Sequence, residues 1–344
     1  MLSLFAAAAA ASQCPAAPAE KTSEHCQNGL LVAKTSRCPS DRYLSLVTPN
    51  LIAAQRDAPF VLLNVGANKG WQIADWYARW GNYNYSAWHG ALQREGGLNS
   101  YEACGRCGQC WSAAPTPDGA SAATAPRAVA IEAQPANADL LRKVVSVSGL
   151  GSVVDVVNAG ASNVTGTLKL TPIRHAGVET GHIAETGRKA GGRAKAERTI
   201  DVPAVTVDSI VASHQLSHVT LLAIDVEGFD ALVLDGAKDL LSRRGAQLVE
   251  FEYHGVGAWR QERSLEAEVE RMCGWGYECF WSGAPGAPPL GIFGALHPLR
   301  PWCPRFETRR YSNVVCAHDD GVKAALRGLT LARAAGEFKQ AQGK

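Results

Sequence analysis

The chain has 344 residues, of which 46% are hydrophobic and 19% charged, and its formal net charge is +2. This composition is typical of a globular protein with a large core and excludes wholesale disorder. The small net charge argues against nucleic acid as a partner. No apolar run approaches the roughly 20 residues of a membrane-spanning helix, so we expect no transmembrane span.

Residues 1–40 are predicted to form a leader followed by an irregular, cysteine-containing arm. The leader, MLSLFAAAAAASQC, has an apolar stretch that ends in small residues, as a signal peptide does, but no Lys or Arg precedes it. The chain contains ten cysteines, an even number that suits disulfides in an oxidising compartment. We therefore expect a protein that is secreted or in the lumen of the secretory pathway, with a cytoplasmic location as the alternative.

The arm leads into the first predicted elements and then into an insertion. The hydrophobic pattern predicts a helix over residues 40–56, a buried strand over 60–65 and a helix over 71–80. Residues 81–127 lack a regular pattern and are predicted to be an irregular insertion, which carries Cys104, Cys107 and Cys110. Zinc sites normally need four ligands, so three cysteines favour disulfides, and we expect no metal site.

Strands and helices alternate over the rest of the chain. Strands are predicted at residues 128–132, 153–158, 166–171, 219–225, 247–253, 277–281 and 312–317, and helices at 137–148, 206–214, 230–243 and 265–274. This alternation predicts an α/β fold with a doubly wound, mostly parallel sheet, closed by an antiparallel hairpin at one edge. We expect one domain over residues 41–319 and a peripheral helical tail over 320–344.

Two features lie outside this regular pattern. Residues 174–198 are polar and glycine-rich, which favours a mobile surface loop. Near the last strands, Cys303 with Cys316 and Cys273 with Cys279 are candidate disulfide pairs, although cysteine connectivity cannot be read from a sequence.

A cofactor site is predicted where the first strand ends. Gly66 follows the strand VLLNV directly, and Gly70 opens the next helix. A dinucleotide-binding turn needs three glycines, as G-x-G-x-x-G, but here Asn68 occupies the middle position and the last glycine comes one residue early. This spacing disfavours a pyrophosphate and favours S-adenosylmethionine. Glu132 ends the next strand, where a carboxylate can accept both ribose hydroxyls, and Lys69 is predicted to be a solvated turn residue.

Five segments together resemble a known family, the FkbM S-adenosylmethionine-dependent methyltransferases. They are VGANKG, AIEAQPAN, VNAGASNVTGTLKL, TVDSIVASH and LLAIDVEGFDALVLDGA. The resemblance implies a Rossmann-like methyltransferase sheet and methyl transfer to a hydroxyl of a sugar, glycan or related small molecule. One departure is Ala223, where the family often has Lys. By position, the expected cofactor residues are Asn64, Gly66, Asn68, Gly70, Glu132, Asn158, Ala159 and Asp225.

The catalytic residues are expected at the ends of the later strands. Asp225 is predicted to lie near the reacting centre, with Glu227 or His254 as the base that takes the proton of the acceptor hydroxyl. The alternatives are that Glu227 caps the following helix and that His254 is a hydrogen-bonded loop residue. For the whole protein, the alternatives are an NAD-dependent oxidoreductase and a methyltransferase-like binding module without catalysis. Tryptophans that could stack on a sugar, with core packing as the default, are Trp88, Trp111, Trp259 and Trp281.

Overall fold

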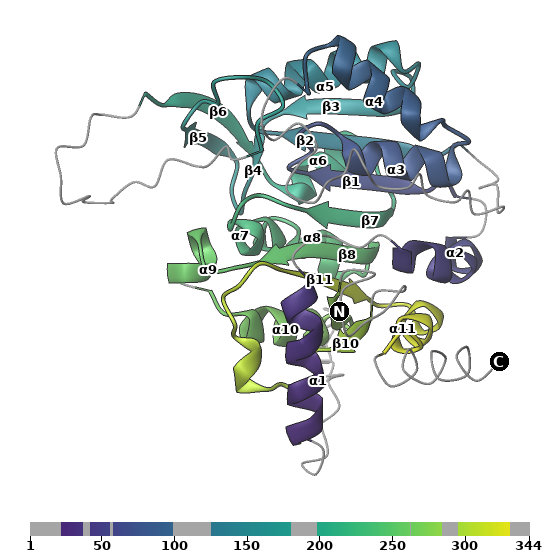
Figure 1. The fold of residues 1–344 in the computed structure, drawn as a ribbon, viewed down its shortest axis with the longest axis vertical. Helices are drawn as coiled ribbons and strands as arrows, with labels where there is room; N and C mark the ends of the chain where they lie inside the picture. Colours follow the sequence, from purple (N-terminus) through teal and green to yellow (C-terminus); the bar gives the residue numbers. More distant parts are fainter. Residues whose placement is uncertain are drawn as a thin grey trace, which may run out of the picture.

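The computed structural model describes residues 22–36, 42–55, 58–98, 125–179, 198–261, 263–283 and 295–330. The strands of its main sheet are β1 (Val61–Val65), β2 (Arg127–Glu132), β3 (Val154–Asn158), β7 (Val219–Ile224), β8 (Ala246–Tyr253), β9 (Glu278–Ser282), β10 (Leu296–Pro298) and β11 (Ser312–Ala317). Their order is β10-β9-β11-β8-β7-β1-β2-β3, as Figure 1 shows. The five strands from β8 to β3 pair in parallel, whereas β11 and β10 pair antiparallel.

The mostly parallel sheet with an antiparallel edge is therefore confirmed. The two last predicted strands pair with each other, as β9 and β11, but β11 inserts between β8 and β9. The edge itself is β10, a strand of three residues that is too short to leave a hydrophobic pattern in the sequence.

Helices cover both faces of the sheet (Figure 1). They are α1 (Thr22–Thr35), α2 (Arg42–Gln55), α3 (Trp71–Trp80), α4 (Tyr85–Arg94), α5 (Pro135–Val147), α6 (Val207–Ser213), α7 (Asp230–Asp235), α8 (Lys238–Ser242), α9 (Gly257–Gln261), α10 (Leu265–Gly274) and α11 (Asp320–Arg327). None of the helices in the described ranges is long and apolar enough to cross a membrane.

Each face of the sheet has its own hydrophobic core, because successive side chains of a strand point to opposite faces. Leu63 and Leu222 belong to the core that includes residues of α1, α6, α7, α8 and α10. Leu62 and Leu221 belong to the core that includes residues of α2, α3, α4, α5 and α11. This arrangement confirms the doubly wound fold.

The stretch predicted to be irregular, residues 81–127, contains the helix α4. Asn84 caps it, since its side-chain Oδ1 accepts a hydrogen bond from the backbone N–H of Ser86 at 3.0 Å. Trp88, on the buried face of α4, is fully buried, as are Trp259 and Trp281, so all three pack in the core. The prediction of an irregular segment was wrong for α4, and Cys104, Cys107, Cys110 and Trp111 lie outside the described residues.

A second, three-stranded sheet packs near the end of β2. Its strands are β4 (Gly160–Ala161), β5 (Gly166–Leu170) and β6 (Ile200–Val205), in the order β4-β6-β5. The predicted strand 166–171 belongs to this sheet, and β6 was not predicted. The predicted helix 230–243 is also divided into α7 and α8. The break is at Gly236, where a Cβ would come within 2.1 Å of the carbonyl oxygen of Ser162.

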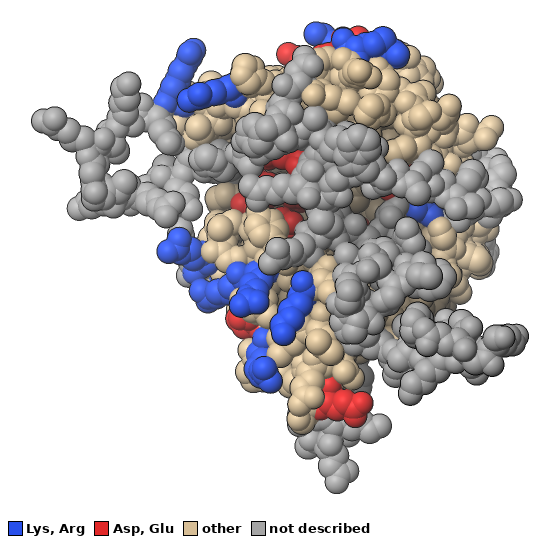
Figure 2. All heavy atoms as spheres, in the orientation of Figure 1, with Lys and Arg blue, Asp and Glu red and all other residues tan. Residues whose placement is uncertain are grey.

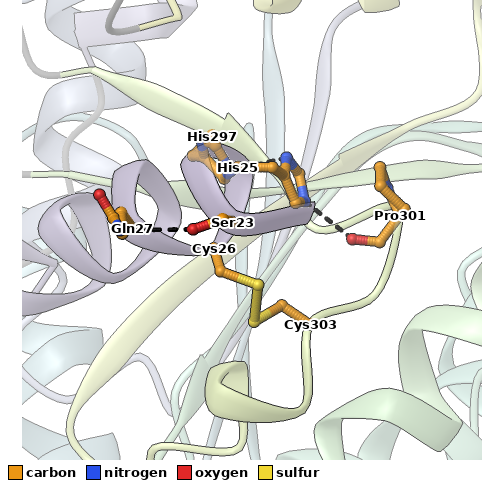
Figure 3. Close-up of a disulfide and its surroundings, with 7 residues drawn as sticks. All are labelled: Ser23, His25, Cys26, Gln27, His297, Pro301 and Cys303. Atoms are coloured by element: carbon orange, nitrogen blue, oxygen red, sulfur yellow. Dashed lines mark hydrogen bonds between the residues drawn. A yellow bond between two sulfur atoms is a disulfide. The ribbon is translucent and has the colours of Figure 1, made fainter. Parts of the chain in front are cut away.

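Between cysteines of the described ranges, two disulfides join distant parts of the chain. Figure 3 shows Cys26 of α1 bonded to Cys303, with the His25 ring close to the Pro301 carbonyl oxygen (2.8 Å). The second bond joins Cys279 and Cys316, which are directly opposite each other on β9 and β11. The candidate pairs Cys303–Cys316 and Cys273–Cys279 were therefore wrong, because strand register decides the partner and sequence proximity does not.

Opening the Cys26–Cys303 bond is expected to lower the free energy of unfolding more than opening the Cys279–Cys316 bond. The bonds join residues that are 277 and 37 positions apart, and chain entropy gives a difference of about 2 kcal/mol. Urea unfolding of Cys26→Ala/Cys303→Ala, with Cys279→Ala/Cys316→Ala as the matched control, measures both losses. A larger loss in the control would show that packing of the strand cysteines outweighs loop closure.

Candidate functional site

The glycine turn after β1 is compact, and its two glycines are required by close neighbours. Gly66 has a φ of 80°, and a Cβ there would lie 1.8 Å from the carbonyl oxygen of Asp225. Gly70 has a φ of 74° and precedes α3, where a Cβ would meet Leu141 and Trp88 at 2.6 Å. Left-handed backbone with no room for a side chain is accessible to glycine alone. The turn therefore holds the ends of β1 and β7 against each other.

Glu132, at the end of β2, is fixed by the same turn. Its carboxylate accepts hydrogen bonds from the backbone N–H groups of Asn68 and Gln134, both at 2.8 Å. The residue is 5% exposed, and burial raises the pKa of its carboxyl, although these hydrogen bonds act in the opposite direction. The structure thus brings together Glu132 and Asn68, which are 64 residues apart in sequence.

The other expected cofactor residues lie on neighbouring strands. Asn158 Nδ2 and the backbone N–H of Ala159 both donate to the backbone carbonyl oxygen of Glu132, at 2.8 and 3.1 Å. Asn64, within β1, is 3% exposed and donates to Gln72 of α3 at 2.7 Å. The ends of β1, β2, β3 and β7 therefore meet at one edge of the sheet, as the sequence predicted.

Lys69 is buried, so the prediction of a solvated turn residue was wrong. Its side chain is 0% exposed, and Nζ donates to the Glu179 carboxylate and to the Gly177 carbonyl oxygen, both at 2.8 Å. Nearby, the Val178 carbonyl oxygen accepts from the side-chain amides of Asn68 and Asn137 at 3.2 and 3.1 Å. The first part of the predicted surface loop, residues 174–179, is thereby tied onto the glycine turn.

Lys69→Met is expected to lower the free energy of unfolding by about 3 kcal/mol, because it breaks an ion pair whose ammonium is fully buried. The matched control is Lys169→Met, whose pair with Asp201 leaves both side chains more than half exposed and should cost under about 1 kcal/mol. Urea unfolding of both variants measures the losses. Equal losses would contradict a structural role for the buried pair.

Asp225 directly follows the last residue of β7. Its side chain is exposed to solvent, yet loss of hydration is the largest of the causes that raise the pKa of its carboxyl to about 7. The charges of Glu227, Glu179 and Glu132 raise the pKa further, in that order. We call these four acids the acidic floor. Red acidic atoms are visible near the centre of the face shown in Figure 2.

Glu227 and His254 are connected through a residue that the sequence analysis missed, Tyr311. The Tyr311 hydroxyl donates to Glu227 Oε2 at 3.0 Å, and its ring stacks on His254 with the centroids 4.4 Å apart. Glu227 does not cap the next helix, because Phe229 occupies the N-cap position of α7. Tyr311 is 84 residues from Glu227 and precedes a strand without any motif, so no sequence signal marks it.

His254 is 1% exposed, and its ring nitrogens have no hydrogen-bond partner among the described residues. The nearest acid is Glu252, whose Oε2 lies 3.5 Å from Nε2. Burial lowers the pKa of His254 to about 4, so its ring is neutral at pH 7 and a weak proton acceptor. The alternative of a hydrogen-bonded loop histidine was therefore wrong.

Asp230 is a second buried acid next to these residues. Asp230 is fully buried and accepts from the backbone N–H groups of Gly228 and Glu252, both at 3.3 Å. Burial raises its pKa well above the usual range, and the charge of Asp225 adds to this effect. Asp230 thereby links the turn after β7 to the end of β8.

The sequence of these elements matches a known family. A family model for the methyltransferase FkbM domain matches residues 108–279, which is half of the chain. The chain belongs to the FkbM methyltransferase family. The match includes Glu132, Asp225 and His254, whereas the glycine turn lies before it, and it confirms the resemblance found in the sequence.

The solved structures that resemble this chain are distant from it in sequence. A methyltransferase FkbM from Methylobacillus flagellatus has 12% identity and a TM-score of 0.39, covering 85% of this chain and 59% of its own. A SAM-dependent methyltransferase from Agrobacterium tumefaciens has 9% identity and a TM-score of 0.32, covering 80% and 61%. An O-methyltransferase from Bacillus cereus in complex with SAH has 11% identity and a TM-score of 0.29, covering 87% and 91%.

The chain spans about three-fifths of the length of the Methylobacillus protein. No curated protein gave a significant match.

Ala223 occupies the position in β7 where the resemblance led us to expect Lys. The residue is 3% exposed and lies in register with Asn64 of β1 and Glu250 of β8. Glu250 accepts a hydrogen bond from the Tyr43 hydroxyl of α2 at 3.2 Å. Tyr43 therefore contacts Glu250, the acid that lies opposite Ala223 in the sheet.

Proposed function

We propose that this chain is an S-adenosylmethionine-dependent methyltransferase that acts on a hydroxyl of a sugar, glycan or related small molecule. The acidic floor is the observation that carries the proposal. S-adenosylmethionine bears a sulfonium and an ammonium group, and both favour a site lined by carboxylates. A pyrophosphate would be repelled there, and the buried ammonium nearest the turn, Lys69, is paired with Glu179. This charge pattern supports the methyl donor over NAD.

The residues around the turn fit the parts of such a cofactor. Glu132 would accept hydrogen bonds from the ribose hydroxyls. One backbone N–H donates to each of its carboxylate oxygens, and each oxygen has a second lone pair for a ribose hydroxyl. Asn68 Oδ1 is buried and has no hydrogen-bond partner in the described part of the chain, and this acceptor suits the cofactor's amino group. When bound, S-adenosylmethionine supplies an electrophilic methyl group.

Asp225 is the best-matched base of the three candidates. A general base works best when its pKa lies near the working pH, and the carboxyl of Asp225 has a pKa of about 7. His254, with a pKa of about 4, would hold a proton poorly. The acceptor hydroxyl would give its proton to Asp225, which makes its oxygen a better nucleophile, and Glu227 would keep the pKa of Asp225 high.

Transfer of a tritiated methyl group from S-adenosylmethionine to a panel of sugars and glycosides tests the proposal. We expect label in a product that survives alkali, because methyl ethers resist hydrolysis and methyl esters do not. Label that alkali releases would indicate a carboxyl acceptor instead. Cofactor binding with no transfer to any acceptor would favour a binding module.

We also propose that the protein works in an oxidising compartment. Two disulfides support this, Cys26–Cys303 and Cys279–Cys316, since such bonds persist mainly outside the reducing cytosol. Recovery of both bonds from native cells by mass spectrometry, after thiols are blocked, is the expected result.

A further inference from the structure

Three exposed arginines lie next to the acidic floor, and we call them the arginine rim. Arg260 is on α9, and Arg309 and Arg310 are on the segment that leads to Tyr311 and β11. Both segments contact the turn at Glu227 and Gly228. The rim is therefore placed by the same backbone that carries the floor.

The first segment packs closely on that turn. The backbone N–H of Ala258 donates to the Gly228 carbonyl oxygen at 2.9 Å. A Cβ on Gly257 would come within 2.6 Å of the same oxygen, and a Cβ on Gly228 within 2.8 Å of the Val256 carbonyl oxygen. Backbone packing at this distance fixes the start of α9, and with it Arg260, beside the floor.

The second segment is held by side chains at the end of β8. The Tyr253 hydroxyl donates to Glu307 Oε1 at 2.7 Å and accepts from the backbone N–H of Arg309 at 3.0 Å. A Cβ on Gly255 would lie 2.7 Å from the Arg309 carbonyl oxygen. One residue after Arg310, the Tyr311 hydroxyl reaches Glu227. The backbone that carries these two arginines is thus anchored on both sides.

The guanidinium groups of the rim are not neutralised by acids. Arg309 Nη1 contacts only a carbonyl oxygen, that of Arg260, at 3.5 Å, and none of the three pairs with a carboxylate within the described ranges. Other arginines of this half of the molecule do so: Arg263, Arg271, Arg300 and Arg327. In Figure 2, blue side chains gather on the surface below the central red atoms.

We infer that the methyl acceptor carries an anionic group, a carboxylate or a sulfate, at a distance from the hydroxyl that receives the methyl group. The inference rests on the proposed function and specifies its substrate class. The acidic floor repels an anion, while the rim attracts one, so the two fields orient such a molecule with its hydroxyl toward Asp225. Arginine suits this task because its planar fork can bind both oxygens of an oxyanion.

The test measures binding by titration calorimetry, with four probes and the full chain. The probes are a glucuronate-containing tetrasaccharide, its carboxyl-reduced form, a sulfated tetrasaccharide and a single-stranded DNA of four nucleotides. We expect the wild type to bind an acidic saccharide about tenfold tighter than the reduced one, and the carboxylate and sulfate probes distinguish the two anions. Arg309→Gln/Arg310→Gln should lose this preference. The matched control Arg243→Gln, an exposed arginine that precedes β8 and contacts a backbone carbonyl, should keep it.

Equal affinity for charged and reduced saccharides, or binding of neither, would overturn the inference. Tighter binding of the DNA would overturn it as well and would indicate a nucleic-acid partner. Titration of S-adenosylmethionine into the same samples separates the two proposals. If the wild type prefers acidic saccharides but does not bind S-adenosylmethionine, the methyltransferase proposal fails while the rim stands as an anion site.

Discussion

We expect the replacement of Asp225 with Asn to lower the rate of methyl transfer by about 100- to 10,000-fold, the usual contribution of a general base. The amide has almost the same shape but cannot take the proton of the acceptor hydroxyl. Backbone contacts around the residue, such as the hydrogen bond from its N–H to the Val65 carbonyl oxygen at 2.9 Å, do not depend on the side chain. Single-turnover assays with tritiated S-adenosylmethionine measure the loss.

The pH profile gives the same assignment a second readout. Only the ionised carboxylate of Asp225 accepts a proton, so kcat/KM of the wild type should be low at acid pH, rise through about pH 7 and then level off. Glu227→Gln removes the charge that raises the pKa of Asp225, so the rise should move to lower pH. A rise that stays in place in Glu227→Gln would contradict the electrostatic link between the two acids.

Controls separate this role from structural damage. Asp225→Asn should unfold at nearly the same urea concentration as the wild type. The substitution removes repulsion between Asp225 and the neighbouring acids, and it breaks no buried ion pair. If Asp225→Asn keeps its rate within threefold while His254→Gln loses it, His254 is the base and the assignment is wrong.

Replacing Glu132 with Ala weakens binding of S-adenosylmethionine by about 10- to 100-fold, the effect of losing hydrogen bonds to a charged group. Two contributions add in the same direction. The variant loses the acceptor for the ribose hydroxyls, and it releases the backbone N–H of Asn68, which the carboxylate holds at 2.8 Å. The glycine turn then loses its cross-link to β2. Titration calorimetry gives the dissociation constant.

Asp155→Ala is the matched control for Glu132→Ala. Asp155 is an exposed acid of β3, which neighbours β2 in the sheet, so the variant removes one negative charge nearby without touching the turn. Its affinity for S-adenosylmethionine should stay within about twofold of the wild type. Normal binding by Glu132→Ala would show that the ribose contact is made elsewhere.

The parts of the site that could be predicted from sequence are those carried by a single strand and its turn. The run VLLNVGANKG gave the glycine turn, and LLAIDVEG gave the acids at the end of β7, because buried parallel strands end abruptly where the sheet edge opens. Glu132 could be added because acids at the next strand end meet the same edge.

The remaining parts depend on contacts between distant segments. The burial of Lys69 depends on Glu179, 110 residues later, and an isolated turn lysine carries no sign of it. The pairing of Cys279 with Cys316 depends on β11 inserting between β8 and β9. Likewise α4 is a short helix with an internal glycine, Gly90, so its helical pattern in the sequence is weak. The packing of Trp88 against Gly70 is a contact between segments, which the sequence of α4 alone does not show.

The central claim is that the ends of β1, β2 and β7 form a site for a cationic methyl donor. Titration of the purified chain with S-adenosylmethionine, S-adenosylhomocysteine and NAD tests it most directly. We expect saturable binding of S-adenosylmethionine and S-adenosylhomocysteine, and no heat of binding on titration with NAD at the same concentrations. Tight binding of NAD, with no response to the other two, would contradict it.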